Sequence, residues 1–129
     1  MAPRHEARER ALELCYELET RKLDVDTLLS DLAVAPDPYT EMLVRGVDAH
    51  REEIDALLGA RSERWALARM PAVDRAVLRI GGYELGWEPE LSTAIVIDEA
   101  VELAGRYSTA DSGRFVNALL SRMAEDLRP

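Results

Sequence analysis

Cysteine is almost absent from this 129-residue chain, because Cys15 is the only one. A single cysteine excludes an internal disulfide and a cysteine-rich zinc site. No run of about 18 uninterrupted apolar residues occurs, so we expect no membrane-spanning helix. The opening MAPRHEARER lacks the apolar segment and the cleavage pattern of a signal peptide. Together these absences favour a cytoplasmic protein.

Motifs for catalysis are also missing. The chain contains no GxxxxGK or GxGxxG phosphate loop and no GxSxG nucleophile turn. His5 and His50 are too distant in sequence to form an HxxxH pair, so no metal site and no cofactor are expected. Most acidic residues have the pattern of solvated helix faces. We therefore expect a protein that is not an enzyme.

Positive charge is scarce, and the net charge is −9. Such an acidic chain is a poor non-specific nucleic-acid binder, so RNA binding would need a local patch or a basic partner. Of 16 basic residues only Lys22 is a lysine. Arginine suits phosphate and base contacts because its planar fork donates two hydrogen bonds at once. GC-rich coding is the simpler explanation of this arginine excess.

What the sequence has in abundance is helical periodicity, which predicts a single all-α domain over residues 1–129. Asp37 and Pro38 form a helix start, Gly59 is expected to end a helix, and residues 108–111 resemble a capping box. The predicted helices cover residues 4–19, 24–32, 38–49, 52–58, 62–68, 71–85, 93–107 and 108–127.

The first predicted helix combines arginine with an aromatic residue along one edge. At about 100° per residue, Arg4 and Arg8 lie beside the apolar face, and Tyr16 continues that side. Arginine for phosphate and tyrosine for stacking would suit single-stranded RNA. The alternative is a surface helix whose Tyr16 packs on a neighbour. The apolar face itself consists of Ala7, Ala11, Leu14, Cys15 and Leu18.

The only phenylalanine, Phe115, lies on the flank of the last predicted helix beside Arg122. A half-exposed ring next to a cation could stack on a base, but Phe115 could equally be a core-edge residue lying over Leu119.

Glu84 falls in the middle of the apolar face of its helix, where an unpaired carboxylate costs several kcal/mol. Either an arginine from another helix pairs with it or that face is an interface. Gly81 and Gly82 weaken the same helix by roughly 1 kcal/mol each, which close approach of another helix would explain.

Four ordered segments of the chain resemble the NusB family. The first helix is similar to that family's arginine-rich opening, and residues 65–85 are similar to its central helix with the closing "YEL". The segment IDEAVELA resembles "INEAVELA", and the residues from Asp111 to Asn117 match the "DS…FVN" motif.

The resemblance implies a bundle of about seven helices and a transcription antitermination factor. Such a factor would bind boxA RNA of ribosomal RNA leaders together with the ribosomal protein NusE, within an antitermination complex on RNA polymerase. A basic partner would also offset the acidic charge.

By matching position, the resemblance places several residues near RNA. It implies a set of five RNA-binding residues, and it implies that Glu84 and Asp111 lie near the partner or the RNA. The RNA-binding set is Arg4, Arg8, Tyr16, Arg79 and Phe115. We expect the first and last helices to meet, so that Arg8 and Phe115 reach one ligand. Because His5 and Glu6 interrupt the arginines, we expect weak RNA binding without NusE.

Two alternatives to this function remain. One is a protein-only helical module such as a homodimer. The other is a freestanding RNA-binding domain of the type found in some ribosomal RNA methyltransferases, although the chain end at Pro129 favours a freestanding factor.

Overall fold

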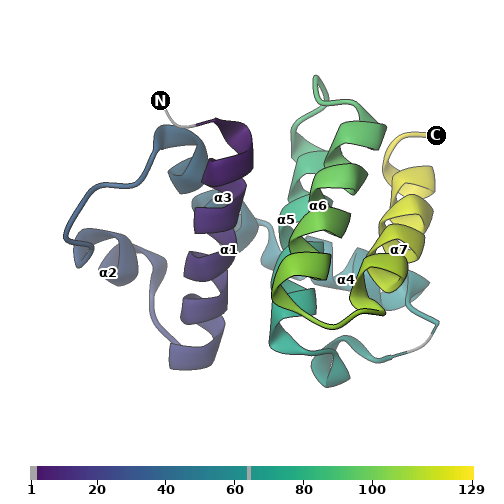
Figure 1. Ribbon diagram of the computed structural model, residues 1–129, viewed down its shortest axis with the longest axis horizontal. Helices are drawn as coiled ribbons and strands as arrows, with labels where there is room; N and C mark the ends of the chain where they lie inside the picture. The colour runs from purple at the N-terminus through teal and green to yellow at the C-terminus, as the bar shows by residue number, and fades with distance from the viewer. Residues whose placement is uncertain (1–2, 64) are drawn as a thin grey trace.

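The computed structural model describes residues 3–63 and 65–129, which form seven α-helices, one 3₁₀ helix and no strand (Figure 1). The all-α prediction is confirmed. Within the described ranges, no helix is both long enough and apolar enough to cross a membrane. The elements are α1 (Arg4–Arg21), α2 (Val25–Ser30), α3 (Pro38–Ala49), α4 (Arg51–Arg61), η1 (Leu67–Arg69), α5 (Ala72–Trp87), α6 (Thr93–Tyr107) and α7 (Ser112–Leu127).

Helix α5 is the centre of the bundle. It packs against α1, α3, α4, α6 and α7, and every residue from Ala76 to Leu85 is buried. Figure 1 shows α1, α2 and α3 on one side of α5, with α6 and α7 on the other. The expectation that the first and last helices meet is therefore wrong, because α5 and α6 lie between α1 and α7 (Figure 1).

Side-chain caps begin several helices where the sequence predicts them. The Asp37 carboxylate accepts a hydrogen bond from the Tyr39 amide at 2.9 Å, and Pro38 is the first residue of α3. Ser92 accepts from the Ile95 amide at 3.2 Å and begins α6. These contacts satisfy amides that the helix itself leaves without an acceptor.

Two predicted boundaries are wrong around α4. The helix continues through Gly59 to Arg61, since a glycine in a well-packed helix weakens it without ending it. The predicted helix over residues 62–68 is wrong, because the described part of that segment is helical only in the short η1, and the Ser62 hydroxyl donates to the Trp65 carbonyl. Residue 64 of that segment lies outside the described residues.

The capping box predicted at residues 108–111 is also wrong. Helix α7 begins at Ser112, and Asp111 makes no capping hydrogen bond with its side chain. Instead, the hydroxyls of Ser108 and Ser112 donate to Asp74 in the first turn of α5, with Ser112 Oγ 2.9 Å from Asp74 Oδ2. Asp74 is fully buried, so its carboxylate requires these donors.

Helix α7 approaches α5 closely, as the glycine pair predicts. A Cβ atom on Gly81 would lie 2.7 Å from Leu120 Cδ1, and one on Gly82 would lie 2.9 Å from Met123 Cε. Gly46 of α3 is tighter still, because a Cβ there would lie 2.3 Å from the ring of Tyr83. That ring is confined, since it lies parallel to the Trp87 ring at 5.9 Å.

We expect Gly46→Ala to lower the free energy of unfolding by about 1–3 kcal/mol, because the added methyl must displace the Tyr83 ring. The matched control is Gly59→Ala in α4, where the Cβ would meet nothing within 4 Å. That control should be neutral or stabilising by up to about 1 kcal/mol. Urea denaturation of both variants measures the difference, and equal effects would contradict the close contact.

Candidate nucleic-acid interface

A buried group of three polar side chains joins α1, α3 and α5. Arg8 is 3% exposed and Glu84 is 1% exposed. The Arg8 Nε lies 3.1 Å and 3.0 Å from the two Glu84 oxygens, and Nη2 approaches Oε2 at 2.9 Å without hydrogen-bond alignment. The Tyr39 hydroxyl donates to the same carboxylate. Glu84 therefore has a cation and a neutral donor from two different helices.

The pKa values within this group follow from burial and charge. Burial alone would lower the pKa of the Arg8 guanidinium, but the hydrogen bonds and the charge of Glu84 raise it above its ordinary value. Burial and the bond to Glu84 raise the pKa of the Tyr39 hydroxyl. Arg8 therefore stays charged and Tyr39 stays protonated, which is the state that the paired carboxylate needs.

Of the two explanations for a carboxylate in the apolar face of α5, the first is correct, because Arg8 from another helix pairs with Glu84. Two placements are consequently wrong. Arg8 does not lie at an exposed edge of the first helix, and Glu84 does not lie at a surface. The long arginine side chain turns inward because the carboxylate in the apolar face of α5 requires compensation.

Arg79 is likewise committed to protein carboxylates. It is 7% exposed, and its Nε and Nη2 donate to the two oxygens of Asp55 at 2.9 Å and 3.0 Å. The Glu19 carboxylate accepts hydrogen bonds from both Arg75 and Arg79. Hydrogen bonds from Arg75 and Arg79 lower the pKa of Glu19 to about 2, although its partial burial opposes the shift. An RNA contact by Arg79 remains a prediction, but the guanidinium already has partners.

Phe115 does not occupy the predicted half-exposed position. It is 8% exposed and packs edge-on against Trp65, with ring centroids 5.1 Å apart. Phe115 therefore lies at the edge of the core, as the alternative interpretation predicts, and its ring is too buried to stack on a base. The prediction that Arg8 and Phe115 reach one ligand is wrong as well, because both side chains are buried and their helices are separated by α5 and α6 (Figure 1). Asp111 is exposed at the start of α7.

Two residues of the predicted RNA-binding set remain open to solvent. Arg4 is exposed, with its guanidinium 4.8 Å from the centre of the Tyr39 ring. Tyr16 is 41% exposed. Arg10, also on α1, pairs with Glu13 at 3.3 Å.

Tyr16 borders a groove of about 350 Å³ that we call the tyrosine groove, between α1, the first turn of α5 and the end of α6. Tyr107 lies across it and is 45% exposed, with the Arg106 guanidinium 5.3 Å from its ring centre. The groove is lined by Glu9, Arg10, Leu12, Glu13, Tyr16, Glu17, Val73 and Tyr107.

Sequence reasoning missed Tyr107. The Arg106–Tyr107 pair at a helix end was a usable signal, but only the fold places it beside α1.

Comparison with known proteins decides the family. The NusB family model matches residues 5–125. The chain belongs to the NusB family. It is 52% identical to the transcription antitermination protein NusB of Saccharopolyspora erythraea, over 96% of this chain and 88% of that protein. It is 40% identical to the NusB of Geobacillus kaustophilus, over 97% of this chain and 98% of that protein.

Solved structures agree with the NusB fold. The chain is 33% identical to T. maritima NusB, and the match covers 99% of this chain and 94% of that chain. The two structures superimpose with a TM-score of 0.90. A complex of NusB and NusE with double-stranded RNA contains a chain that is 25% identical, with a TM-score of 0.81 over 95% of this chain and 96% of that chain. The predicted bundle of about seven helices is confirmed.

We expect Arg8→Met to lower the free energy of unfolding by about 3–5 kcal/mol, because Glu84 would remain buried without a cation. Arg10→Met is the matched control, since Arg10 is 44% exposed and its pair with Glu13 should contribute at most about 1 kcal/mol. Urea denaturation at neutral pH measures both variants. A loss for Arg8→Met no greater than that of the control would show that the buried pair is unimportant.

Glu19 should make part of the stability depend on pH. Its pKa is about 2 in the folded protein against an ordinary 4.5. The folded-state pKa is depressed, so its contribution is fully present above about pH 5 and is lost as the pH falls toward 2. Urea denaturation between about pH 5 and pH 3 should show the stability gap between wild type and Glu19→Gln narrowing.

Glu13→Gln is the control for that series, because Glu13 is 63% exposed and its pair with Arg10 should contribute at most about 1 kcal/mol. A gap for Glu19→Gln that stays constant over the same range would overturn the assigned role of its arginine partners.

Proposed function

We propose that this protein is a transcription antitermination factor that binds boxA RNA together with NusE, as part of a complex on RNA polymerase in the cytoplasm. The relatives that carry this name match nearly the whole chain in sequence. The T. maritima NusB structure superimposes closely on this chain. The complex of NusB and NusE with RNA supports the same assignment. The role is one of binding, with no reaction to catalyse.

The tyrosine groove is the surface that suits RNA best. Tyr16 and Tyr107 are exposed on its two sides, and such rings stack on bases of any sequence. Arg106 and Arg10 lie at its edges and Arg4 lies further along α1, which provides cations for the phosphates. The two open tyrosines are the observation that carries this placement.

The acidic lining of the same groove supports the need for a partner. Glu9, Glu13 and Glu17 border the tyrosines and would repel phosphates. A basic protein such as NusE, bound beside the groove, would neutralise part of this charge and complete the RNA surface. In this arrangement Arg8, Arg79 and Phe115 act through the fold, because they hold the helices that present the exposed side chains.

We expect Tyr16→Ala to weaken boxA binding in the presence of NusE by about 1–3 kcal/mol, whereas Tyr16→Phe should bind as wild type because it keeps the ring. Fluorescence anisotropy with labelled boxA and scrambled RNA, with and without NusE, makes the measurement. Without NusE, binding should be weak and should fade further with added salt.

Unchanged affinity for Tyr16→Ala would remove the tyrosine groove from the RNA surface. No preference for boxA over scrambled RNA in the presence of NusE would contradict the proposed function itself. A protein that forms a stable homodimer and ignores both RNA and NusE would favour the protein-only alternative.

A further inference from the structure

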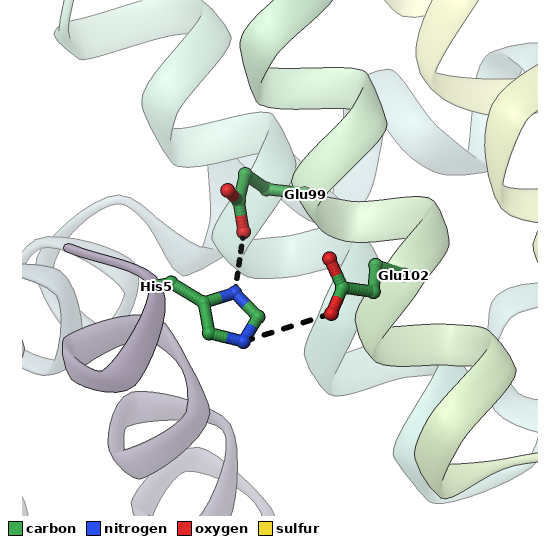
Figure 2. A group of neighbouring side chains, drawn as sticks. All are labelled: His5, Glu99 and Glu102. Atoms are coloured by element: carbon green, nitrogen blue, oxygen red, sulfur yellow. Dashed lines mark hydrogen bonds and ion pairs between the residues drawn. The ribbon is translucent and has the colours of Figure 1, made fainter. Parts of the chain in front are cut away.

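One imidazole and three carboxylates gather between α1 and α6, beside the buried Arg8 pair. His5 and Glu9 are one turn apart on α1, while Glu99 and Glu102 are about one turn apart on α6. Figure 2 shows the His5 ring between Glu99 and Glu102, with one ring nitrogen directed at each. One ligand atom from each of these three residues lies within 4.8 Å of the others.

The two ring nitrogens of His5 have different surroundings. Nδ1 lies 3.0 Å from Glu99 Oε2, which is the distance of a hydrogen bond. Nε2 lies 3.1 Å from Glu9 Oε1 and 3.6 Å from Glu102 Oε1. If Nδ1 carries the proton toward Glu99, the Nε2 lone pair faces two carboxylates and needs a cation beside it, a place that the Arg106 guanidinium takes in this structure with Nη1 3.5 Å from Nε2.

We propose that His5 Nε2, Glu9 and Glu102 form a binding site for a divalent transition-metal ion, which Glu99 supports by accepting a hydrogen bond from Nδ1. A carboxylate on the far nitrogen of a metal-bound histidine fixes the ring orientation and raises its basicity. Helix α1 supplies two ligands one turn apart and α6 supplies the third, so the ion would tie α1 to α6. One imidazole with carboxylates suits Zn²⁺ better than Mg²⁺, which prefers oxygen ligands and water.

A proton or a nearby arginine competes for the same position. The hydrogen bond to Glu99 and the surrounding carboxylates raise the pKa of His5. Arg106 Nη1 lies 3.4 Å from Glu9 Oε1, but its side chain is 49% exposed and can turn into solvent. Arg8 Nη1 is 3.9 Å from Glu99, yet Arg8 is committed to Glu84. An added cation would therefore displace Arg106 from Glu9, which also accepts a hydrogen bond from the Tyr107 hydroxyl, and would leave Arg8 in place.

Two other side chains that could bind Zn²⁺, Cys15 and His50, are not expected to interfere with a test of this site. Cys15 is buried, and burial raises the pKa of its thiol to about 12, so it is a poor competitor for Zn²⁺. The other histidine, His50, faces a single carboxylate, Glu53, at 3.3 Å. His50→Gln is therefore a matched control for His5→Gln.

Isothermal titration calorimetry with Zn²⁺ at about pH 7.5, on the full chain freed of metal by a chelator and then dialysed, tests the proposal. We expect one Zn²⁺ per chain and a rise in Tm. Glu102→Gln, at a residue 52% exposed, and His5→Gln should each lose at least about tenfold in Zn²⁺ affinity, since even outer-shell partners account for 10- to 100-fold. His50→Gln should bind as wild type, and Mg²⁺ should bind more weakly.

Absence of Zn²⁺ binding by the wild-type chain would overturn the proposal, as would binding that His5→Gln and Glu102→Gln leave intact. Circular dichroism of both variants without metal shows whether they fold. If His5→Gln fails to fold, the Glu102→Gln titration alone decides between a metal site and a cluster that only joins α1 to α6.

Discussion

The ion pair between Arg8 and Glu84, with Tyr39 as a second donor, is the constraint on which the arrangement of α1 depends. Glu84 is 1% exposed within the apolar face of α5, so the carboxylate must be compensated where it lies. Arg8 supplies the charge from α1, and Tyr39 supplies a hydroxyl from α3. This pairing fixes which side of α1 faces α5. Arg4 and Tyr16 lie further along the same side of α1, where they reach solvent, while His5 and Glu9 face α6.

Most of the fold could be predicted from the sequence, because helix periodicity and caps are local properties. Pro38 begins a helix after Asp37 as expected, and the Gly81–Gly82 pair indicates the close approach of α7. The errors arose where a distant residue overrides a local signal. Residues 108–111 resemble a capping box, yet the hydroxyls of Ser108 and of Ser112, the first residue of α7, donate to Asp74 of α5, which no local pattern shows.

The candidate site was less predictable, because a helical projection gives the direction of a side chain and not what covers it. Arg8 projects to an edge, but its long side chain reaches a buried carboxylate 76 positions away in the chain. Phe115 projects to a flank that Trp65 happens to cover. The tyrosine groove and the His5 cluster each combine α1 with α6, so the spacing of residues along one segment could reveal neither. The expectation of no metal site rested on that kind of local spacing.

The acidic character of the chain and its family role are reconciled by the same geometry. Its central arginines neutralise buried carboxylates, so few cations are left for RNA, which makes a basic partner necessary for the proposed function. The most direct test of the central claim is a double-mutant cycle on Arg8 and Glu84, measured by urea denaturation. Arg8→Met with Glu84→Leu should recover most of the stability that either substitution loses alone, since no charge is then left buried without a partner. Losses that simply add would contradict the claim that this pair orients α1.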